Sequence, residues 1–235
     1  MKKIFFDTLP STNLYLKENY NSLDNLTLVY TNHQTEGRGR LGRTWIDGDD
    51  LLFSILIKDN ITKPTDYTFL MAITFVNVLK KYNLNSSIKW PNDIIVNKKK
   101  ISGILLEGIS EDNLKAVIIG CGLNTNTTSF PKEIFFKATS MTKELKVKID
   151  KEKLLDEIIV EFESLYNSYI NNKLDLFNLV RNNLHAMNKV IRFVYDGLEQ
   201  IGSIKGIDDE GRLLVNTRGN ILHLTSGEIT LHNEY

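Results

Sequence analysis

The chain contains the stretch GRGRLGRTW at Gly37–Trp45, in which three glycines and three arginines precede a tryptophan. Glycine lacks a Cβ atom, so its backbone can approach a ligand closely. Arginine supplies a planar, permanent cation that pairs with phosphate and carboxylate oxygens, and the tryptophan ring offers a flat apolar face. This composition is typical of a loop that wraps around a nucleotide or another anion. Taken alone, it also fits a solvated basic hairpin or an RNA-binding tract.

The first six residues of this stretch match the Gly-x-Gly-x-x-Gly pattern of dinucleotide-binding folds. That pattern requires a helix directly after the glycines, because the pyrophosphate binds at the helix N-terminus. Here a turn at 47–50 follows, and then the apolar run Leu51–Ile57 predicts a strand. The sequence therefore excludes a dinucleotide-binding motif. A Walker motif is also excluded, since the chain has no Gly-x-x-x-x-Gly-Lys-Ser/Thr.

The net charge, the cysteine content and the apolar runs of the sequence restrict the kind of protein that this chain can be. The chain has 235 residues, with 29 Lys plus Arg and 29 Asp plus Glu, so its formal net charge is zero. A dedicated nucleic-acid binder usually carries a basic excess, so we expect the arginine cluster to act locally on a small anion. The single cysteine, Cys121, fits a reducing compartment. No apolar run approaches the roughly 18 residues of a membrane span, and we expect a cytoplasmic protein without membrane contact.

The hydrophobic pattern predicts an α+β fold. Short β-branched runs predict strands at 4–6, 26–32, 51–57, 87–89, 94–96, 101–106 and 116–119. Helical spacing of apolar residues predicts helices at 12–20, 64–79, 150–169 and 174–184. Together they predict a mixed, mainly antiparallel sheet flanked by helices. After Asn188 the spacing changes to tight hairpins, which predicts a small β-barrel. We therefore expect domains at 1–187 and 188–235.

Further glycine- or proline-marked segments resemble ligand-binding strand ends. Lys89–Asp93 reads KWPND, and its proline ends strand pairing directly after a lysine. Lys100–Glu107 reads KISGILLE, and Gly120–Asn124 reads GCGLN. Each segment alone fits an ordinary turn or strand end. Their conjunction with the glycine–arginine stretch, within about ninety residues, indicates one shared site.

These four segments occur in the order and spacing of biotin protein ligases, and the chain resembles that family over nearly its whole length. Ser11-Thr12-Asn13 resembles the family's N-terminal biotin-contacting motif, and Gln34 precedes the loop as it does there. Ala138–Met141 resembles a later Ala-Thr-Ser-Leu segment. The resemblance implies a catalytic domain like that of class II aminoacyl-tRNA synthetases, followed by an SH3-like β-barrel. Because only ten residues precede Ser11, it also implies a monofunctional form without the DNA-binding module.

The resemblance implies a reaction in two steps. Biotin and Mg-ATP form biotinyl-5′-AMP and pyrophosphate, and a lysine of a biotin carboxyl carrier domain, from acetyl-CoA carboxylase or another carboxylase, then takes the biotinyl group. The catalytic cations implied are Lys89 and Arg40. The implied biotin contacts are Ser11, Thr12, Asn13, Gln34, Gly37, Arg38, Gly39, Arg40, Lys89 and Gly103. The implied ATP contacts are Arg40, Arg43, Trp45, Lys89, Asn92 and Asn124, and no resident metal is expected.

Other interpretations stay open from sequence. One is a lipoate or octanoate ligase that uses the same acyl-adenylate chemistry. A second is a nucleic-acid-binding module without enzymatic activity, which the zero net charge disfavours. A third is a biotin sensor without transfer activity, against which the presence of Lys89 argues. An edge strand near the loop also leaves a homodimer open.

Overall fold

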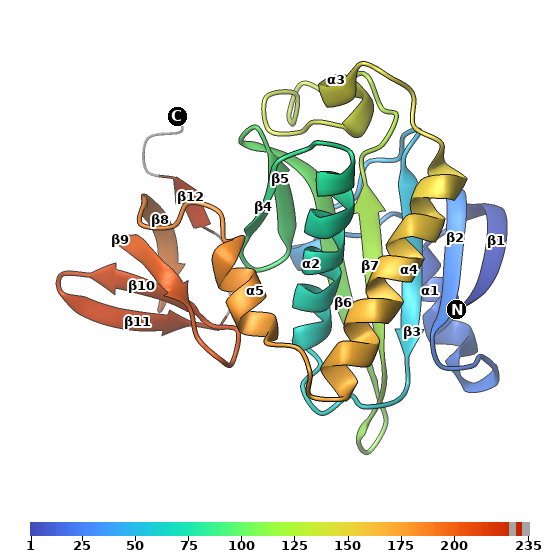
Figure 1. The fold of residues 1–235 in the computed structure, drawn as a ribbon, viewed down its shortest axis with the longest axis horizontal. Coiled ribbons are helices and arrows are strands. Elements are labelled where there is room, and N and C mark those ends of the chain that lie inside the picture. Colours follow the sequence, from blue (N-terminus) through green and yellow to red (C-terminus); the bar gives the residue numbers. More distant parts are fainter. Residues whose placement is uncertain (226–228, 232–235) are drawn as a thin grey trace.

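The computed structural model describes residues 1–225 and 229–231, and Figure 1 shows two sheets of different size with helices packed against them. The larger sheet has seven strands in the order β1-β2-β3-β7-β6-β5-β4. The strands of this sheet are β1 (Lys2–Leu9), β2 (Thr27–Gln34), β3 (Leu51–Ile57), β4 (Ser86–Lys89), β5 (Asp93–Val96), β6 (Lys99–Ser110) and β7 (Leu114–Leu123).

The larger sheet is mixed and mainly antiparallel, as predicted. Among the described strands, β1 and β2 run parallel, whereas every other neighbouring pair in this sheet is antiparallel. Helices cover both of its faces. The helices are α1 (Thr12–Asn19), α2 (Asp66–Lys81), α3 (Met141–Leu145), α4 (Lys151–Ile170) and α5 (Leu176–Asn182).

The two faces of the larger sheet are covered unequally. In Figure 1, α2 and α4 lie side by side across one face, where they form the main core, and α1 lies behind the sheet. On the face of α1, a smaller cluster joins Leu16 to Val29 and Leu56. Every residue of β3 is buried because both faces are covered there. Beyond α1, the same face stays open over β6 and β7, and this opening receives the glycine–arginine stretch.

The helix start predicted at Asp150 is confirmed. The Asp150 side chain accepts a hydrogen bond from the backbone N–H of Lys153, which is the usual role of an N-cap residue. The other predicted helices also form, with ends that differ by a few residues. The short helix α3 was missed, although Ser140 caps it through a hydrogen bond from the Lys143 N–H. Among the described residues, no helix is long and apolar enough to span a bilayer.

The second sheet is antiparallel, with the strand order β11-β10-β9-β8-β12. Within the described residues this order is open at β11 and β12, so the predicted closed barrel is not seen. The end of the predicted 188–235 domain, residues 226–228 and 232–235, lies outside the described residues. The strands are β8 (Val190–Tyr195), β9 (Leu198–Ile207), β10 (Leu213–Thr217), β11 (Asn220–Leu224) and β12 (Ile229–Leu231).

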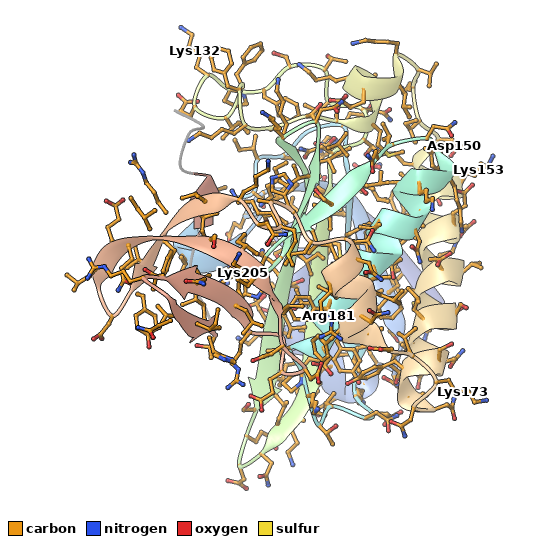
Figure 2. All side chains as sticks on the ribbon, turned by 60° about the vertical axis from the view of Figure 1, so that its left-hand side comes forward. Lys132, Asp150, Lys153, Lys173, Arg181 and Lys205 are labelled. Atoms are coloured by element: carbon orange, nitrogen blue, oxygen red, sulfur yellow. The ribbon has the colours of Figure 1, made fainter. Side chains whose placement is uncertain are left out.

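The C-terminal sheet packs against α5, next to the edge of the larger sheet that β4 forms (Figure 1). Figure 2 labels Arg181 on α5, beside this sheet. Its guanidinium donates to the carbonyl of Ile207 at 3.2 Å and to Asp209 Oδ1 at 3.0 Å. The buried indole of Trp90 donates to the carbonyl of Gly211 at 2.9 Å. Trp90 belongs to the KWPND segment, so the C-terminal sheet directly contacts a segment of the candidate site.

Candidate active site

Glycines form the floor of the candidate site, on the open face of β6 and β7. Gly103 and Gly122 are direct cross-strand partners and therefore point to the same face. The ring of Trp45 lies against both of them. A Cβ atom at Gly122 would lie 2.4 Å from this ring, and one at Gly103 would lie 2.9 Å from it. Only glycine leaves room for the indole at these two positions.

The glycine–arginine stretch is a small hairpin, which we call the Arg-Gly hairpin (Gly37–Trp45). The Trp45 N–H donates to the Gly37 carbonyl at 3.0 Å, and the Gly39 N–H donates to the Arg43 carbonyl at 2.7 Å. Its tip turns at Leu41, whose φ of 56° lies in the left-handed region. The hairpin holds its tryptophan against the sheet and places its arginines along the rim.

Arg40 connects the hairpin to the KWPND segment. Its Nη1 donates to Asn92 Oδ1 at 2.9 Å, and Asn92 Nδ2 donates to the carbonyl of Ile104 at 2.8 Å. Asn92 is therefore held by β6 and in turn holds the guanidinium. This bond brings together two segments that the sequence predicted to share one site.

Lys89 lies at the end of β4, and its register places it on the face of the site. It pairs with Asp93 of β5, which pairs with Gly103 of β6, and directly paired residues share a face. Lys89 is half-buried. A second amine lies in the same region: Lys100 Nζ contacts Asp93 Oδ1 at 2.7 Å and lies 5.5 Å from the centre of the Trp45 ring. Lys100 was not among the predicted site residues, although it begins the KISGILLE segment.

Polar side chains from α1, β2, β3 and β6 form a hydrogen-bonded group at one end of the site. Thr12 donates from its backbone N–H to Gln34 Oε1 at 2.8 Å, and its hydroxyl lies 2.6 Å from that of Ser54. Asn13 accepts from Ser54 at 2.5 Å and donates to Glu107 Oε2 at 2.6 Å. Ser11 caps α1 by accepting from the Leu14 N–H. The predicted residues of this group lie together, with the two unpredicted residues Ser54 and Glu107 between and beside them.

The Arg-Gly hairpin encloses a cleft of about 730 Å³. Four of the predicted biotin residues line it, and so do Arg43 and Glu107. Lys89, Trp45 and Asn92 are not among the residues that line this cleft. The lining residues are Thr35, Glu36, Gly37, Arg38, Gly39, Arg40, Leu41, Gly42, Arg43, Thr44, Leu105 and Glu107.

Asn124 has a structural role as well as its predicted ATP contact. It is buried, and its Nδ2 donates to the Thr139 carbonyl at 2.9 Å, which ties the end of β7 to the segment before α3. Cys121 is also buried, and burial raises the pKa of its thiol well above the ordinary value. Cys121 therefore packs as a small apolar side chain. Among the described residues, no three His, Cys, Asp or Glu side chains are grouped to hold a metal ion.

The sequence matches two family profiles. Residues 5–124 match the biotin/lipoate A/B protein ligase family, and residues 188–231 match the biotin protein ligase C-terminal domain. The bifunctional ligase/repressor BirA of Bacillus subtilis is 33% identical over 246 residues, which cover 97% of this chain and 73% of that protein. The biotin–[acetyl-CoA-carboxylase] ligase of Mycobacterium tuberculosis is 25% identical and covers 88% of this chain and 79% of its own.

The fold agrees with these matches. The solved structure of the biotin protein ligase from Aquifex aeolicus in complex with biotin and ATP aligns with a TM-score of 0.88 and 25% identity over 98% of both chains. On the evidence of both profiles, the BirA relative and this structure, the chain belongs to the biotin protein ligase family.

Proposed function

We propose that this chain joins biotin to AMP and then transfers the biotinyl group to a lysine of a biotin carboxyl carrier domain. The observation that carries the proposal is the hydrogen bond from Arg40 to Asn92. It fixes a cation of the hairpin beside the segment that begins with Lys89. Two anions must meet in the first step, so fixed cations at this place lower the barrier between them.

In the first step, a carboxylate oxygen of biotin attacks the α-phosphorus of Mg-ATP. The bond from the α-phosphorus to the bridging oxygen breaks, and pyrophosphate leaves. In the second step, the carrier's lysine amine attacks the acyl carbon, the bond from that carbon to the AMP oxygen breaks, and the amine loses a proton. Both nucleophiles come from substrates, so the chain needs no nucleophilic side chain of its own.

We assign the residues as follows. Arg40 and Lys89 neutralise the carboxylate and the α-phosphate, because charge grows on the phosphoryl oxygens in the transition state. The side chains of Ser11, Thr12, Asn13 and Gln34 bind the ureido head. Trp45, Asn92, Arg43 and Asn124 bind the nucleotide.

The test is biotin-dependent exchange of pyrophosphate into ATP, run in parallel with biotin, lipoate and octanoate. We expect exchange with biotin at a rate far above that with either fatty acid. Exchange with lipoate or octanoate in preference to biotin would replace the proposed function with the related ligase. No exchange with any acid would reject an acyl-adenylate mechanism altogether.

A matched pair of variants tests the proposed role of the Lys89 amine. Lys89→Gln removes the amine of the site and should lower the exchange rate at least about 100-fold, by analogy with other lost transition-state donors. Lys98→Gln makes the same change at an exposed position in the turn between β5 and β6 and should leave the rate within about twofold, since an exposed surface charge contributes little. Equal rates for the two variants would contradict the role of Lys89.

A further inference from the structure

Five polar side chains from four elements form one continuous line of hydrogen bonds, which we call the polar line. Its members are Gln34 of β2, Thr12 and Asn13 of α1, Ser54 of β3 and Glu107 of β6. Thr12, Asn13 and Ser54 are each less than 5% exposed. Buried polar groups must be paired, so the direction of every bond in the line matters.

The first end of the polar line is fixed by the backbone. The Thr12 N–H can only donate, and it lies 2.8 Å from Gln34 Oε1. The carboxamide of Gln34 must therefore present its oxygen to Thr12 and its NH₂ group in the other direction. That NH₂ group lies toward Gly37, which lines the cleft. This end of the line offers hydrogen-bond donors to a ligand.

The second end is fixed by Glu107. An ionised carboxylate can only accept, so Asn13 must turn its NH₂ group to Glu107 and its oxygen to Ser54. The Ser54 proton is then used on Asn13, so the Thr12 hydroxyl is the donor between these two hydroxyls, and its single proton is shared between Ser54 Oγ at 2.6 Å and Gln34 Oε1 at 3.1 Å. One carboxylate thus orients three buried side chains. Because Glu107 also lines the cleft, this end of the line offers an acceptor.

We propose that Glu107 is a specificity-determining residue, which orients Asn13 and accepts a hydrogen bond from a ring N–H of the substrate head group. The inference rests on the proposed function. A cyclic urea presents a carbonyl oxygen flanked by two N–H groups, so it needs donors on one side and an acceptor on the other. The polar line supplies both, with Gln34 at one end and Glu107 at the other. A lipoate dithiolane ring lacks these groups and would leave both ends unpaired.

The test compares Glu107→Gln with Glu111→Gln, a matched control beyond the end of the same strand. A glutamine at 107 can present an N–H where the carboxylate only accepts, so the orientation of Asn13 is no longer fixed. Calorimetry should give a Kd for biotin raised about tenfold to 100-fold in Glu107→Gln, in line with the penalty for unpaired buried groups. Desthiobiotin keeps the cyclic urea and lacks the sulfur ring, so its Kd should rise by the same factor.

Two further readouts separate recognition from general disruption. The Kd for ATP should stay unchanged in Glu107→Gln, and the loss in pyrophosphate exchange should appear in the KM for biotin more than in kcat, because the polar line lies apart from the cations. Equal biotin affinity in Glu107→Gln and the parent would overturn the inference, and so would a parallel loss of ATP affinity. If the parent itself failed to bind biotin, the proposed function would fail instead.

Discussion

At the scale of single residues, Arg40 joins the Arg-Gly hairpin to the KWPND segment through a hydrogen bond that spans 52 positions of the chain. Asn92 can hold the guanidinium in one orientation since β6 holds Asn92. We expect Arg40→Gly to keep the fold, because Arg40 lies in a hairpin at the surface, and to bind biotinyl-5′-AMP about 100-fold more weakly. The measurement is the rate at which purified protein releases the adenylate.

Lys98→Gly is the control for this variant. It also replaces a cation with glycine, at a hairpin tip whose φ of 65° suits glycine. We expect it to retain the adenylate as the parent does. If Arg40→Gly retained the adenylate equally well, the assignment of Arg40 would be wrong, because the loss of a hairpin cation would then have no effect on the intermediate.

Most residues of the candidate site were predicted from the sequence because they occur in unusual combinations of neighbouring residue types. Glycine next to arginine, and lysine before proline, are rare enough to be noticed. Ser54 gave no such signal, because it is a single small polar residue in a strand that is otherwise apolar. Glu107 had a weak signal: it lies four residues after Gly103 in a strand, and the period of two places both on the same face. Its link to Asn13 depends on α1, whose position no local pattern reports.

At the scale of elements, β7 uses glycine to admit α1 as well as Trp45. A Cβ atom at Gly120 would lie 2.2 Å from Asn13 Oδ1. We expect Gly120→Ala to displace the Asn13 side chain from the polar line and to raise the Kd for biotin about tenfold or more, with a loss of stability of about 1–3 kcal/mol from overpacking. Biotin calorimetry and thermal unfolding measure the two effects.

Gly108→Ala on the neighbouring strand is the matched control. The nearest atom to an added Cβ there is the end of the Leu114 side chain, at 3.1 Å, which can move. Biotin affinity should stay at the parental value in this variant. Equal affinity in Gly120→Ala would mean that the position of Asn13 is unimportant for binding.

The turn between β9 and β10 depends on one carboxylate. Burial alone raises the pKa of Asp208, but hydrogen bonds from the His223 ring, from the guanidinium and backbone N–H of Arg212 and from the backbone N–H of Glu210 outweigh it and lower that pKa to about 2. A carboxylate with a lowered folded-state pKa stabilises the fold above its unfolded pKa, near 4, and this contribution is lost as the pH falls toward 2. We therefore expect Asp208→Asn to be less stable than the parent at pH 7 by about 1–2 kcal/mol.

The pH dependence distinguishes this charge effect from a packing effect. The stability difference between Asp208→Asn and the parent should shrink as the pH falls from 4 to 2, measured by denaturant unfolding at each pH. A difference that stays constant over this range would show that the turn needs the shape of Asp208 rather than its charge.

Elements with a strong local pattern were predicted well, and those defined by tertiary contacts were not. The strand Leu51–Ile57 has the predicted bounds because its apolar run is bounded by turn residues. The five-residue helix α3 is too short to show a helical period, and it depends on Ser140 and on the backbone of Asn124 and Thr125. The parallel pairing of β1 with β2 likewise depends on the path of α1 between them. Spacing along the chain cannot report such contacts.

At the scale of the whole molecule, the two sheets meet at the KWPND segment. Gly211 presents its carbonyl to the Trp90 indole from a turn with φ of 78°, and a Cβ at Gly211 would lie 2.6 Å from Phe69. A residue other than glycine would therefore push this turn away from Phe69 and disturb its hydrogen bond with Trp90. Because Trp90 lies directly between Lys89 and Pro91, we expect the C-terminal sheet to help position Lys89, the proposed catalytic cation, although no residue of this sheet is among those that line the cleft.

This arrangement predicts a selective effect of Trp90→Phe. The phenyl ring keeps most of the apolar packing and loses the hydrogen bond to Gly211, at a cost of about 1–2 kcal/mol in stability. We expect kcat for pyrophosphate exchange to fall several-fold because Lys89 becomes less well held, whereas the Kd for biotin alone should not change because the polar line is untouched. Steady-state exchange and biotin calorimetry on the same preparation check both values. A loss of biotin affinity equal to the loss in kcat would mean that Trp90 supports the whole site, and an unchanged kcat would mean that the C-terminal sheet does not position Lys89.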